Sequence, residues 1–313
     1  MTAQERGVSV VIPAREAAAT ISRALDSVLA QDPPPLEMIV VDDASRDATA
    51  AIVAGYAAHG VRLLHLDEPA GAAAARNAGI DAAAGNLVAF QDADDEWLPG
   101  KLARQLEVLD SDPRIAFVAC DCRLIAADGH DLGPLYGGQV PAAGPAAWRG
   151  LLARNTIATP SVLVRRMALL EAGGFDPTLP VAEDQDMWIR LALHGHLGYV
   201  DAPLVRVHVT SGSLSGVGSP GGCHQQIAVT LPMVRRHLAA MEGSLSAAER
   251  RAILGERLGR IGRTAYASGL HLEGLRMIAQ ASLLGFRPVG NLWFLAHAAP
   301  PSRWLKRRLL RHH

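Results

Sequence analysis

The sequence has little of three things: cysteine, net charge and long apolar runs. Three of its 313 residues are cysteines, Cys120, Cys122 and Cys223. They are too few and too unevenly spaced for a disulfide framework or a closed zinc site, so we interpret them as reduced packing residues. The formal net charge of -1 gives no reason to expect a nucleic acid as a partner. A chain of this length can bury enough core to be stable without cross-links.

The sequence also lacks the patterns of a secretory leader and of a membrane span. The early apolar run at 8–12 is short and ends at Pro13, which is typical of a strand. No run of roughly 18 uninterrupted apolar residues occurs anywhere in the sequence. We therefore expect a cytoplasmic location.

The last residues have a different pattern, in which apolar and basic side chains alternate from Trp304 to Arg311. This pattern is typical of a basic amphipathic helix on an anionic membrane surface, and it would make the protein peripheral on the inner face of the cell membrane. The alternative is a solvated helix that packs on its own domain.

Short apolar runs alternate with helical patterns over the first 120 residues, as they do in a parallel α/β sheet. Strands are expected at 8–12, 38–41, 61–66 and 87–90, and helices at 17–30, from 44–47 onward and at 72–83. Two of these strands end in clusters of carboxylates, Asp42 with Asp43 and Asp92 with Asp94 and Asp95. Because ligands of open parallel sheets collect at the carboxyl ends of strands, both clusters predict a ligand site, and the second suggests a divalent cation. An acidic turn followed by a helix cap is the alternative for the second cluster.

A helix of very small residues is expected between these clusters, at 71–79, with Arg76 as its one long side chain. The segment lacks the glycines and the lysine of a phosphate-binding loop. Arg76 is either a solvated or ion-paired residue, or a group that faces a diphosphate or a base.

Seven segments with motif character occur in order along the sequence. They are Val8-Ser9-Val10-Val11-Ile12-Pro13, Val40-Val41-Asp42-Asp43-Ala44-Ser45, Ala75-Arg76-Asn77-Ala78-Gly79, Phe90-Gln91-Asp92-Ala93-Asp94-Asp95-Glu96-Trp97, Gly173-Gly174-Phe175-Asp176, the run from Glu183-Asp184 to Leu191, and Arg206-Val207-His208. Each motif is weak by itself, and the ordered set is specific. In order and spacing these segments resemble the family 2 glycosyltransferases, and the resemblance covers roughly residues 7–215.

The resemblance implies a GT-A fold, an α/β architecture in which a Rossmann-like, mostly parallel central sheet is flanked by helices. Residues 1–222 would form the catalytic domain, with a nucleotide-sugar-binding half at 1–110 and an acceptor half at 111–222. Residues 223–313 would form a C-terminal helical region with the basic amphipathic tail. Within that region, helices are expected at 231–241 and 247–258, and a helix or a helical pair interrupted by Gly269 and Gly274 is expected at 263–284.

The resemblance also implies roles for the donor-side residues. Asp92 and Asp94 would bind Mn²⁺ or Mg²⁺, with Asp94 the more direct ligand, and His208 would complete the metal shell or meet the diphosphate. Asp95 would orient the donor sugar or cap the helix that contains Lys101.

Other residues would bind the nucleotide sugar. Asp43 would accept a hydrogen bond from the nucleobase, and Asp42 would support it or bind ribose; a helix cap formed with Ser45 is the alternative for this pair. The remaining donor-side residues are Pro13, Ala14, Arg76, Asn77, Asp92 and Ala93. The chain departs from the family pattern at Arg15-Glu16, where an aromatic residue and an asparagine are usual, and this puts the details of base recognition in doubt.

On the acceptor side, Asp184 is the candidate general base and Glu183 its alternative, since single-displacement inversion needs a group that takes the acceptor proton. An acidic helix N-terminus is the structural alternative. The segment at 155–161 would bind sugar hydroxyls. Trp148 and Trp188 would either stack on a sugar or pack in the core.

These expectations together describe an inverting transferase. It would move a sugar from a nucleoside diphosphate, with a UDP-sugar favoured, to a saccharide or lipid-linked saccharide acceptor in the synthesis of a cell-surface polysaccharide or glycoconjugate. The alternatives are a nucleotidyltransferase and a non-catalytic nucleotide-sugar-binding module. A homodimer contact through the C-terminal helices is a further expectation.

Overall fold

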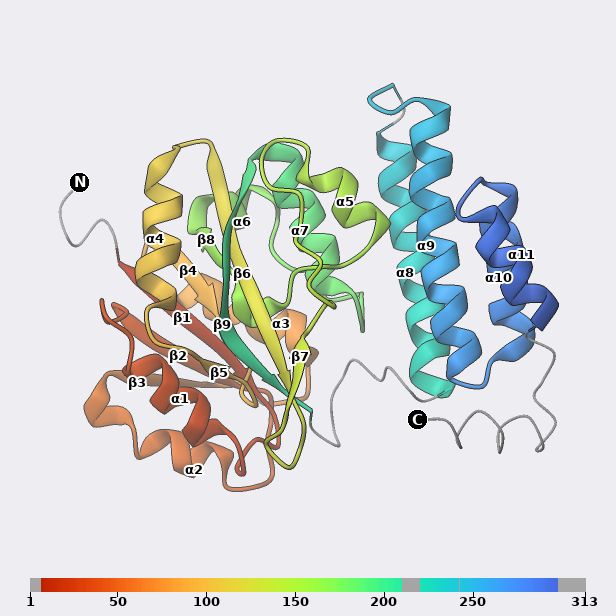
Figure 1. Ribbon diagram of the computed structural model, residues 1–313. Coiled ribbons are helices and arrows are strands. Elements are labelled where there is room, and N and C mark those ends of the chain that lie inside the picture. The colour runs from red at the N-terminus through yellow and green to blue at the C-terminus, as the bar shows by residue number, and fades with distance from the viewer. Residues whose placement is uncertain (1–6, 210–219, 242, 298–313) are drawn as a thin grey trace. The chain divides into compact units, whose positions relative to one another are not determined.

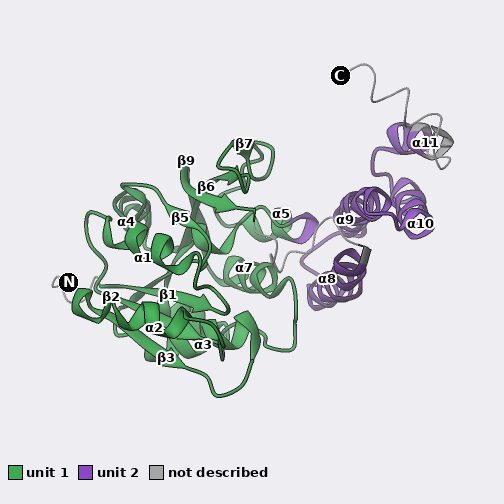
Figure 2. Ribbon diagram, turned by 90° about the horizontal axis from the view of Figure 1, so that it is seen from below, with its two compact units in different colours: residues 1–151, 155–213 green, residues 152–154, 214–313 purple. Residues whose placement is uncertain are grey.

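The computed structural model describes residues 7–209, 220–241 and 243–297 (Figure 1). The chain divides into two compact units, one of residues 1–151 and 155–213 and the other of residues 152–154 and 214–313 (Figure 2). Each unit is described by itself below.

The first unit is built on a single mixed sheet of nine strands in the order β3-β2-β1-β4-β8-β6-β9-β5, with β7 paired to β6. Its strands are β1 (Val8–Ala14), β2 (Glu37–Asp42), β3 (Val61–His65), β4 (Leu87–Phe90), β5 (Glu96–Trp97), β6 (Ile115–Ile125), β7 (Asp131–Pro134), β8 (Leu163–Arg165) and β9 (His196–His208). The half from β3 to β4 is parallel throughout, and β8 pairs antiparallel with both β4 and β6. The predicted α/β fold class is confirmed.

Helices cover both faces of this sheet (Figure 1). They are α1 (Ile21–Leu29), α2 (Thr49–Ala54), α3 (Gly71–Ala82), α4 (Lys101–Ser111), α5 (Ala147–Ala153), α6 (Arg166–Glu171) and α7 (Glu183–His194), with short 3-10 turns at Ala57–His59 and Thr159–Ser161. Alternate residues of β1 face opposite layers, because side chains alternate along a strand. Val10 and Ile12 belong to the core under α1 and α4, whereas Val11 faces Gly79 of α3.

Two helices begin later than the apolar pattern predicts. The backbone N–H groups of Ala17 and Ala18 donate to Thr49 Oγ1 at 2.8 Å and to Asp47 Oδ2 at 3.0 Å. The segment before Ile21 therefore connects the loops that follow β1 and β2. Those bonds hold the two loops together at the carboxyl end of the sheet.

An aromatic cluster fills the layer between the sheet and α7. The Trp188 ring stacks on Phe117 at 6.1 Å and meets Phe175 edge-on at 5.8 Å, and Phe90 meets Phe175 at 5.3 Å. Trp188 is fully buried. Core packing is therefore its role, and the alternative that it stacks on a sugar is wrong for this residue.

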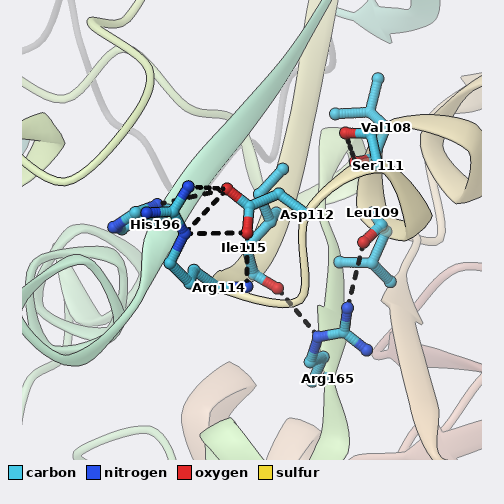
Figure 3. A network of polar contacts seen from close by, with 8 residues as sticks. All are labelled: Val108, Leu109, Ser111, Asp112, Arg114, Ile115, Arg165 and His196. Atoms are coloured by element: carbon cyan, nitrogen blue, oxygen red, sulfur yellow. Dashed lines mark hydrogen bonds and ion pairs between the residues drawn. The ribbon is translucent and has the colours of Figure 1, made fainter.

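A polar network joins α4, β6 and β8 (Figure 3). It lies at the end of the sheet opposite the carboxyl ends of β1 and β2. Asp112 accepts from Arg114 at 2.8 and 3.0 Å, and hydrogen bonds from Arg114 are the main reason that the pKa of Asp112 falls to about 2. Arg165 donates to the Leu109 and Ile115 carbonyls. This network fastens the start of β6, far along the strands from the acidic clusters.

The second unit consists of the helices α8 (Pro220–Ala240), α9 (Ala247–Ala267), α10 (His271–Leu283) and α11 (Pro288–His297) within the described residues. Of the two alternatives expected at 263–284, the helical pair is the one observed, divided between α9 and α10, because Gly269 has a φ of +95° and ends the first helix. Gly274 does not break a helix: a Cβ there would lie 2.6 Å from the Gly262 carbonyl oxygen, so the glycine permits close packing of α9 and α10.

None of the helices in the described ranges is long and apolar enough to cross a membrane. The predicted basic tail, Trp304 to Arg311, lies outside the described residues.

Candidate active site

The two acidic clusters predicted for the donor side lie at the ends of strands β2 and β4, and both strands end at the same edge of the sheet as β1. β2 and β4 pair with opposite sides of β1, so the strand order reverses at β1. Such a reversal point is where open α/β sheets bind ligands.

The acidic loop after β4 is partly buried. The Asp95 N–H donates to the Asp92 carbonyl at 3.1 Å, which closes the loop into a turn. Arg23 of α1 donates to the Asp94 carbonyl oxygen from the other side. The pKa of Asp92 is raised, first by burial and then by Asp94, although Arg76 opposes the rise. Crowded carboxylates of this kind favour the approach of a cation.

Asp95 connects this loop to the end of β9. Its carboxylate accepts the His208 N–H at 3.0 Å, and it is 3% exposed. Burial, followed by Asp92 and Asp94, raises the pKa of Asp95 well above its ordinary value. The cap predicted for the helix of Lys101 is wrong, because that helix begins after Gly100 and no side chain caps it.

The His208 imidazole lies beside the acidic loop. Its Nε2 atom is buried without a hydrogen bond and lies 3.6 Å from Glu96 Oε2. Burial lowers its pKa, with the positive charge of Arg23 next, so the ring is neutral at pH 7 and its nitrogen can serve as a ligand.

Three metal-ligating side chains do not gather into a preformed cation site within the described part of the chain. The donor chemistry nevertheless fits Mg²⁺ or Mn²⁺, because these ions are commonly held by one or two carboxylates together with substrate phosphates. Asp92 and Asp94 supply such carboxylates on one turn.

The acidic pair after β2 is bound to the protein itself. Asp42 is fully buried; its Oδ1 accepts the Ser45 N–H at 3.2 Å, and its Oδ2 lies 3.0 Å from His65 Nδ1. Asp43 accepts the N–H groups of Ala70 at 2.6 Å and Gly71 at 3.0 Å. Asp43 thus joins the start of α3 to the carboxyl end of β2. The fully buried carboxylate of Asp42 is thus bonded to Ser45 and His65.

Arg76 connects the acidic loop after β4 to the acidic start of α7. Its Nη1 donates to Glu183 Oε1 at 2.7 Å and its Nη2 to Asp92 Oδ1 at 3.1 Å, and its side chain is 6% exposed. Burial alone would lower the pKa of Arg76, but Asp92 and Glu183 raise it above its ordinary value. The expectation that Arg76 is solvated is therefore wrong. Arg76 is ion-paired with Asp92 and Glu183.

The other residues predicted for the donor side bind backbone groups or pack in the interior. Asn77 exchanges two hydrogen bonds of 2.8 Å with the Phe175 backbone, so its amide fastens α3 to the segment before α7. Ala14 and Ala93 are buried, and Pro13 is partly exposed at the end of β1.

Glu183 and Asp184, the acidic pair predicted for the acceptor side, begin α7. Ala182, which precedes the helix, has a φ of +63° and a ψ of +15°, a left-handed conformation that is costly for alanine. Asp184 accepts the Gln185 N–H at 2.6 Å through Oδ1 and the Asn155 amide at 2.9 Å through Oδ2. Burial, followed by the negative charge of Glu183, raises the pKa of Asp184 to about 7. A carboxyl group with this pKa can exchange a proton near neutral pH.

Two neighbours of Asp184 were not predicted as its partners. Asn155 begins the segment whose small hydroxyl residues were expected to bind a sugar, and its own side chain donates to Asp184. Tyr136, in the turn after β7, has a pKa raised well above its ordinary value by burial and then by the negative charge of Asp184. No local sequence signal links either residue to Asp184, because the contacts depend on the sheet.

Comparison with known proteins identifies related chains. A family model described as glycosyl transferase family 2 matches residues 9–129. Succinoglycan biosynthesis protein ExoO of Rhizobium meliloti (strain 1021) is 43% identical over 126 residues, which are 40% of this chain and 36% of that protein. Uncharacterized protein MT1568 of Mycobacterium tuberculosis (strain CDC 1551 / Oshkosh) is 33% identical over 219 residues, 65% of this chain and 68% of that one.

A further relative is named for its reaction. UDP-Glc:alpha-D-GlcNAc-diphosphoundecaprenol beta-1,3-glucosyltransferase WfgD of Escherichia coli is 37% identical over 102 residues, 33% of this chain and 40% of that protein. The chain thus spans well under two thirds of both ExoO and WfgD.

Solved structures share the fold at lower identity. S. aureus TarS 1-349 in complex with UDP-GlcNAc matches with a TM-score of 0.66 and 20% identity over 89% of this chain and 81% of that one. Mannosyltransferase PcManGT from Pyrobaculum calidifontis, in complex with GDP-Man and Mn2+, matches with a TM-score of 0.53 and 20% identity over 91% and 87%.

Proposed function

The chain belongs to glycosyltransferase family 2, and from this premise we propose that it transfers a sugar from a nucleoside diphosphate to a saccharide or lipid-linked saccharide acceptor, with inversion at the anomeric carbon. The observation that carries the proposal is the Arg76 bridge: one guanidinium contacts both Asp92, on the donor-side loop, and Glu183, next to the candidate base. One side chain thus contacts both the loop proposed to bind the leaving diphosphate and the residue next to the proposed base.

The donor binds at the carboxyl ends of β1, β2 and β4. Pro13 and Ala14 flank the nucleobase, and Asp43, which is held against the start of α3, accepts a hydrogen bond from it. Arg15 lies 3.8 Å from Asp43 and is half exposed, so it is available to the base or ribose. We propose a UDP-sugar as the donor, which agrees with the UDP-GlcNAc bound to TarS and the UDP-Glc in the name of WfgD.

Asp92 and Asp94 would hold Mn²⁺ or Mg²⁺, and His208 would complete the metal shell or contact the diphosphate. When bound, the cation offsets the negative charge that builds up on the leaving diphosphate. Mn2+ in the PcManGT complex supports this part of the proposal. Arg76 adds a fixed positive charge behind Asp92.

Asp184 acts as the general base. It takes the proton of the acceptor hydroxyl as that oxygen attacks the anomeric carbon, and the electron pair of the broken bond leaves with the diphosphate. Glu183 is less suited to this role, because Arg76 holds its carboxylate at 2.7 Å.

The acceptor is proposed to be an intermediate of cell-surface polysaccharide or glycoconjugate synthesis, in agreement with the names of ExoO and WfgD. A cytoplasmic enzyme that contacts the inner face of the membrane through residues 304–311 would meet a lipid-linked acceptor there. A homodimer through the C-terminal helices remains part of the proposal.

Two measurements test the function. Thermal shifts with nucleoside diphosphates and Mn²⁺ report donor binding, because a ligand stabilises the state that it binds. Transfer or donor hydrolysis is then compared among the wild type, Asp94→Ala and Asp184→Asn. We expect Asp94→Ala to lose the Mn²⁺-dependent shift with the diphosphate, and Asp184→Asn to keep that shift and lose transfer. Full activity in both variants would overturn the proposed mechanism.

A further inference from the structure

We propose that Asn155 is the positioning residue of the reaction: its side-chain amide fixes the orientation of the Asp184 carboxylate toward the acceptor hydroxyl. The inference rests on the proposed function, since it gives Asp184 the role of base.

The geometry assigns both oxygens of Asp184. Oδ1 accepts the Gln185 N–H at 2.6 Å, and Oδ2 accepts Asn155 Nδ2 at 2.9 Å. With one bond to each oxygen, the carboxylate cannot rotate freely, and each oxygen keeps a second lone pair for a proton. Asp184 is partly exposed, so those lone pairs remain accessible.

The orientation of the Asn155 amide is itself determined. Its Oδ1 accepts the Ile157 N–H at 3.2 Å. A backbone N–H can only donate, so the amide oxygen must face Ile157 and the NH₂ group must face Asp184. The Asn155 side chain is therefore a donor to the carboxylate and not an acceptor.

The segment that carries Asn155 is also bonded to α7, the helix that contains Asp184. Gln185, the residue after Asp184, is 2% exposed and donates through Nε2 to the Leu151 carbonyl of α5. Two consecutive residues of α7 thus bind the chain on either side of the α5 terminus. This arrangement sets the distance between the amide and the carboxylate.

The charges around Asp184 predict the consequence of losing the amide. Burial and Glu183 raise the pKa of Asp184, whereas the Gln185 N–H, Arg76 of α3 and the Asn155 amide lower it. Tyr136 approaches from the turn after β7 and carries no charge at neutral pH. Removing Asn155 therefore raises the pKa of Asp184 and lets its carboxylate rotate.

The experiment uses the whole 313-residue chain with Mn²⁺ between pH 5.5 and 9 and measures release of UDP from UDP-N-acetylglucosamine and, as the second donor, of GDP from GDP-mannose. The variants are Asn155→Ala and Asn155→Asp, and Asn86→Ala is the matched control, because Asn86 is an exposed asparagine in the same unit. For Asn155→Ala we expect the acidic limb of the kcat/KM profile to move up by about 1 pH unit and kcat to fall by roughly 10-fold, with the KM for the donor within about 2-fold of the wild type.

The aspartate variant separates positioning from packing. It has nearly the shape of asparagine, so a role in packing alone predicts a milder effect than that of Asn155→Ala. Positioning predicts the opposite, because a second carboxylate beside Asp184 removes the donor and adds repulsion. An acidic limb and a kcat that match the wild type in both variants would overturn the inference, as would a nearly wild-type Asn155→Asp beside an impaired Asn155→Ala. If Asn155→Ala lacks a cooperative thermal transition, Asn155→Ser takes its place.

Failure of the inference differs from failure of the proposed function. If the wild type releases UDP and Asp184→Asn abolishes the release, but the Asn155 variants keep the wild-type profile, Asn155 has no positioning role and the function stands. If Asp184→Asn releases UDP as the wild type does, the base assignment fails, and the inference fails with it.

Discussion

Arg76 and Glu183 form an ion pair of 2.7 Å between helices α3 and α7, although 107 residues separate them in the sequence. The same guanidinium donates to Asp92 at 3.1 Å. The pair is almost fully buried on the arginine side, so each partner compensates a charge that would otherwise be costly. Arg76 therefore links the position of the Asp92 loop to the position of the start of α7, which carries the candidate base.

Arg76→Lys should impair both stability and transfer. A lysine amine is a point charge and cannot reproduce the fork that serves two carboxylates. We expect the free energy of unfolding to fall by about 2–4 kcal/mol and kcat to fall at least ~10-fold, as measured by urea denaturation and donor turnover. Arg62→Lys is the control, since Arg62 forms an exposed pair with Glu37 at 2.6 Å and its replacement should cost less than about 1 kcal/mol. Equal effects of the two variants would contradict a special role for Arg76.

Asp184 should make the fold less stable as the pH rises. Its pKa is about 7 in the folded protein and 3.8 in a free side chain, so the folded state binds its proton more tightly. Its contribution to stability is therefore present below pH 4 and is lost between about pH 4 and 7. Asp184→Asn should then stabilise the fold at pH 8 by about 1–3 kcal/mol relative to the wild type, and by little at pH 4.

Thermal denaturation of both proteins at several pH values checks this linkage. A difference in stability that is the same at pH 4 and pH 8 would mean that the pKa of Asp184 is not raised in the folded state.

Gly79→Ala should destabilise the contact of α3 with β1. A Cβ at residue 79 would lie 2.3 Å from Val11 Cγ1, so the helix must move away from the strand. We expect a loss of about 1–3 kcal/mol. Gly150→Ala is the matched control, because that helical glycine has no atom within 4 Å of its added Cβ, and it should gain about 0.5–1 kcal/mol through helix propensity. Chemical denaturation of the two variants gives the comparison.

Ala182→Gly should stabilise the start of α7. The left-handed backbone at Ala182, with its φ of +63°, costs alanine roughly 1 kcal/mol and costs glycine almost nothing. Ala51→Gly provides the opposite case, because Ala51 is exposed within α2 and should lose about 0.5–1 kcal/mol. If Ala182→Gly also loses stability, the conformation at the helix start is not strained.

The strands and the acidic clusters could be predicted because their signals are local. The parallel strands from β1 to β4 follow from short apolar runs, and the position of Asp42 and Asp92 after such runs places them at one edge of the sheet. The starts of α1 and α2 could not be predicted, because the N–H groups of Ala17 and Ala18 are taken by Thr49 and Asp47, and that competition exists only after the loops meet.

The partners of each polar side chain could not be predicted either, because they come from distant parts of the chain. Asn77 matches a motif that suggests a donor contact, yet its amide is committed to the Phe175 backbone. Asn155 lies 29 residues before Asp184 in the sequence, and only the fold brings its amide to that carboxylate.

The sequence by itself determined the family, the α/β class and which charged residues are candidates for the site, because these depend on residue type and on order along the chain. Only the tertiary structure decided that Arg76 joins Asp92 to Glu183 and that burial raises the pKa of Asp184 to about 7. Distance and desolvation are properties of the packed sheet, and no stretch of sequence contains them.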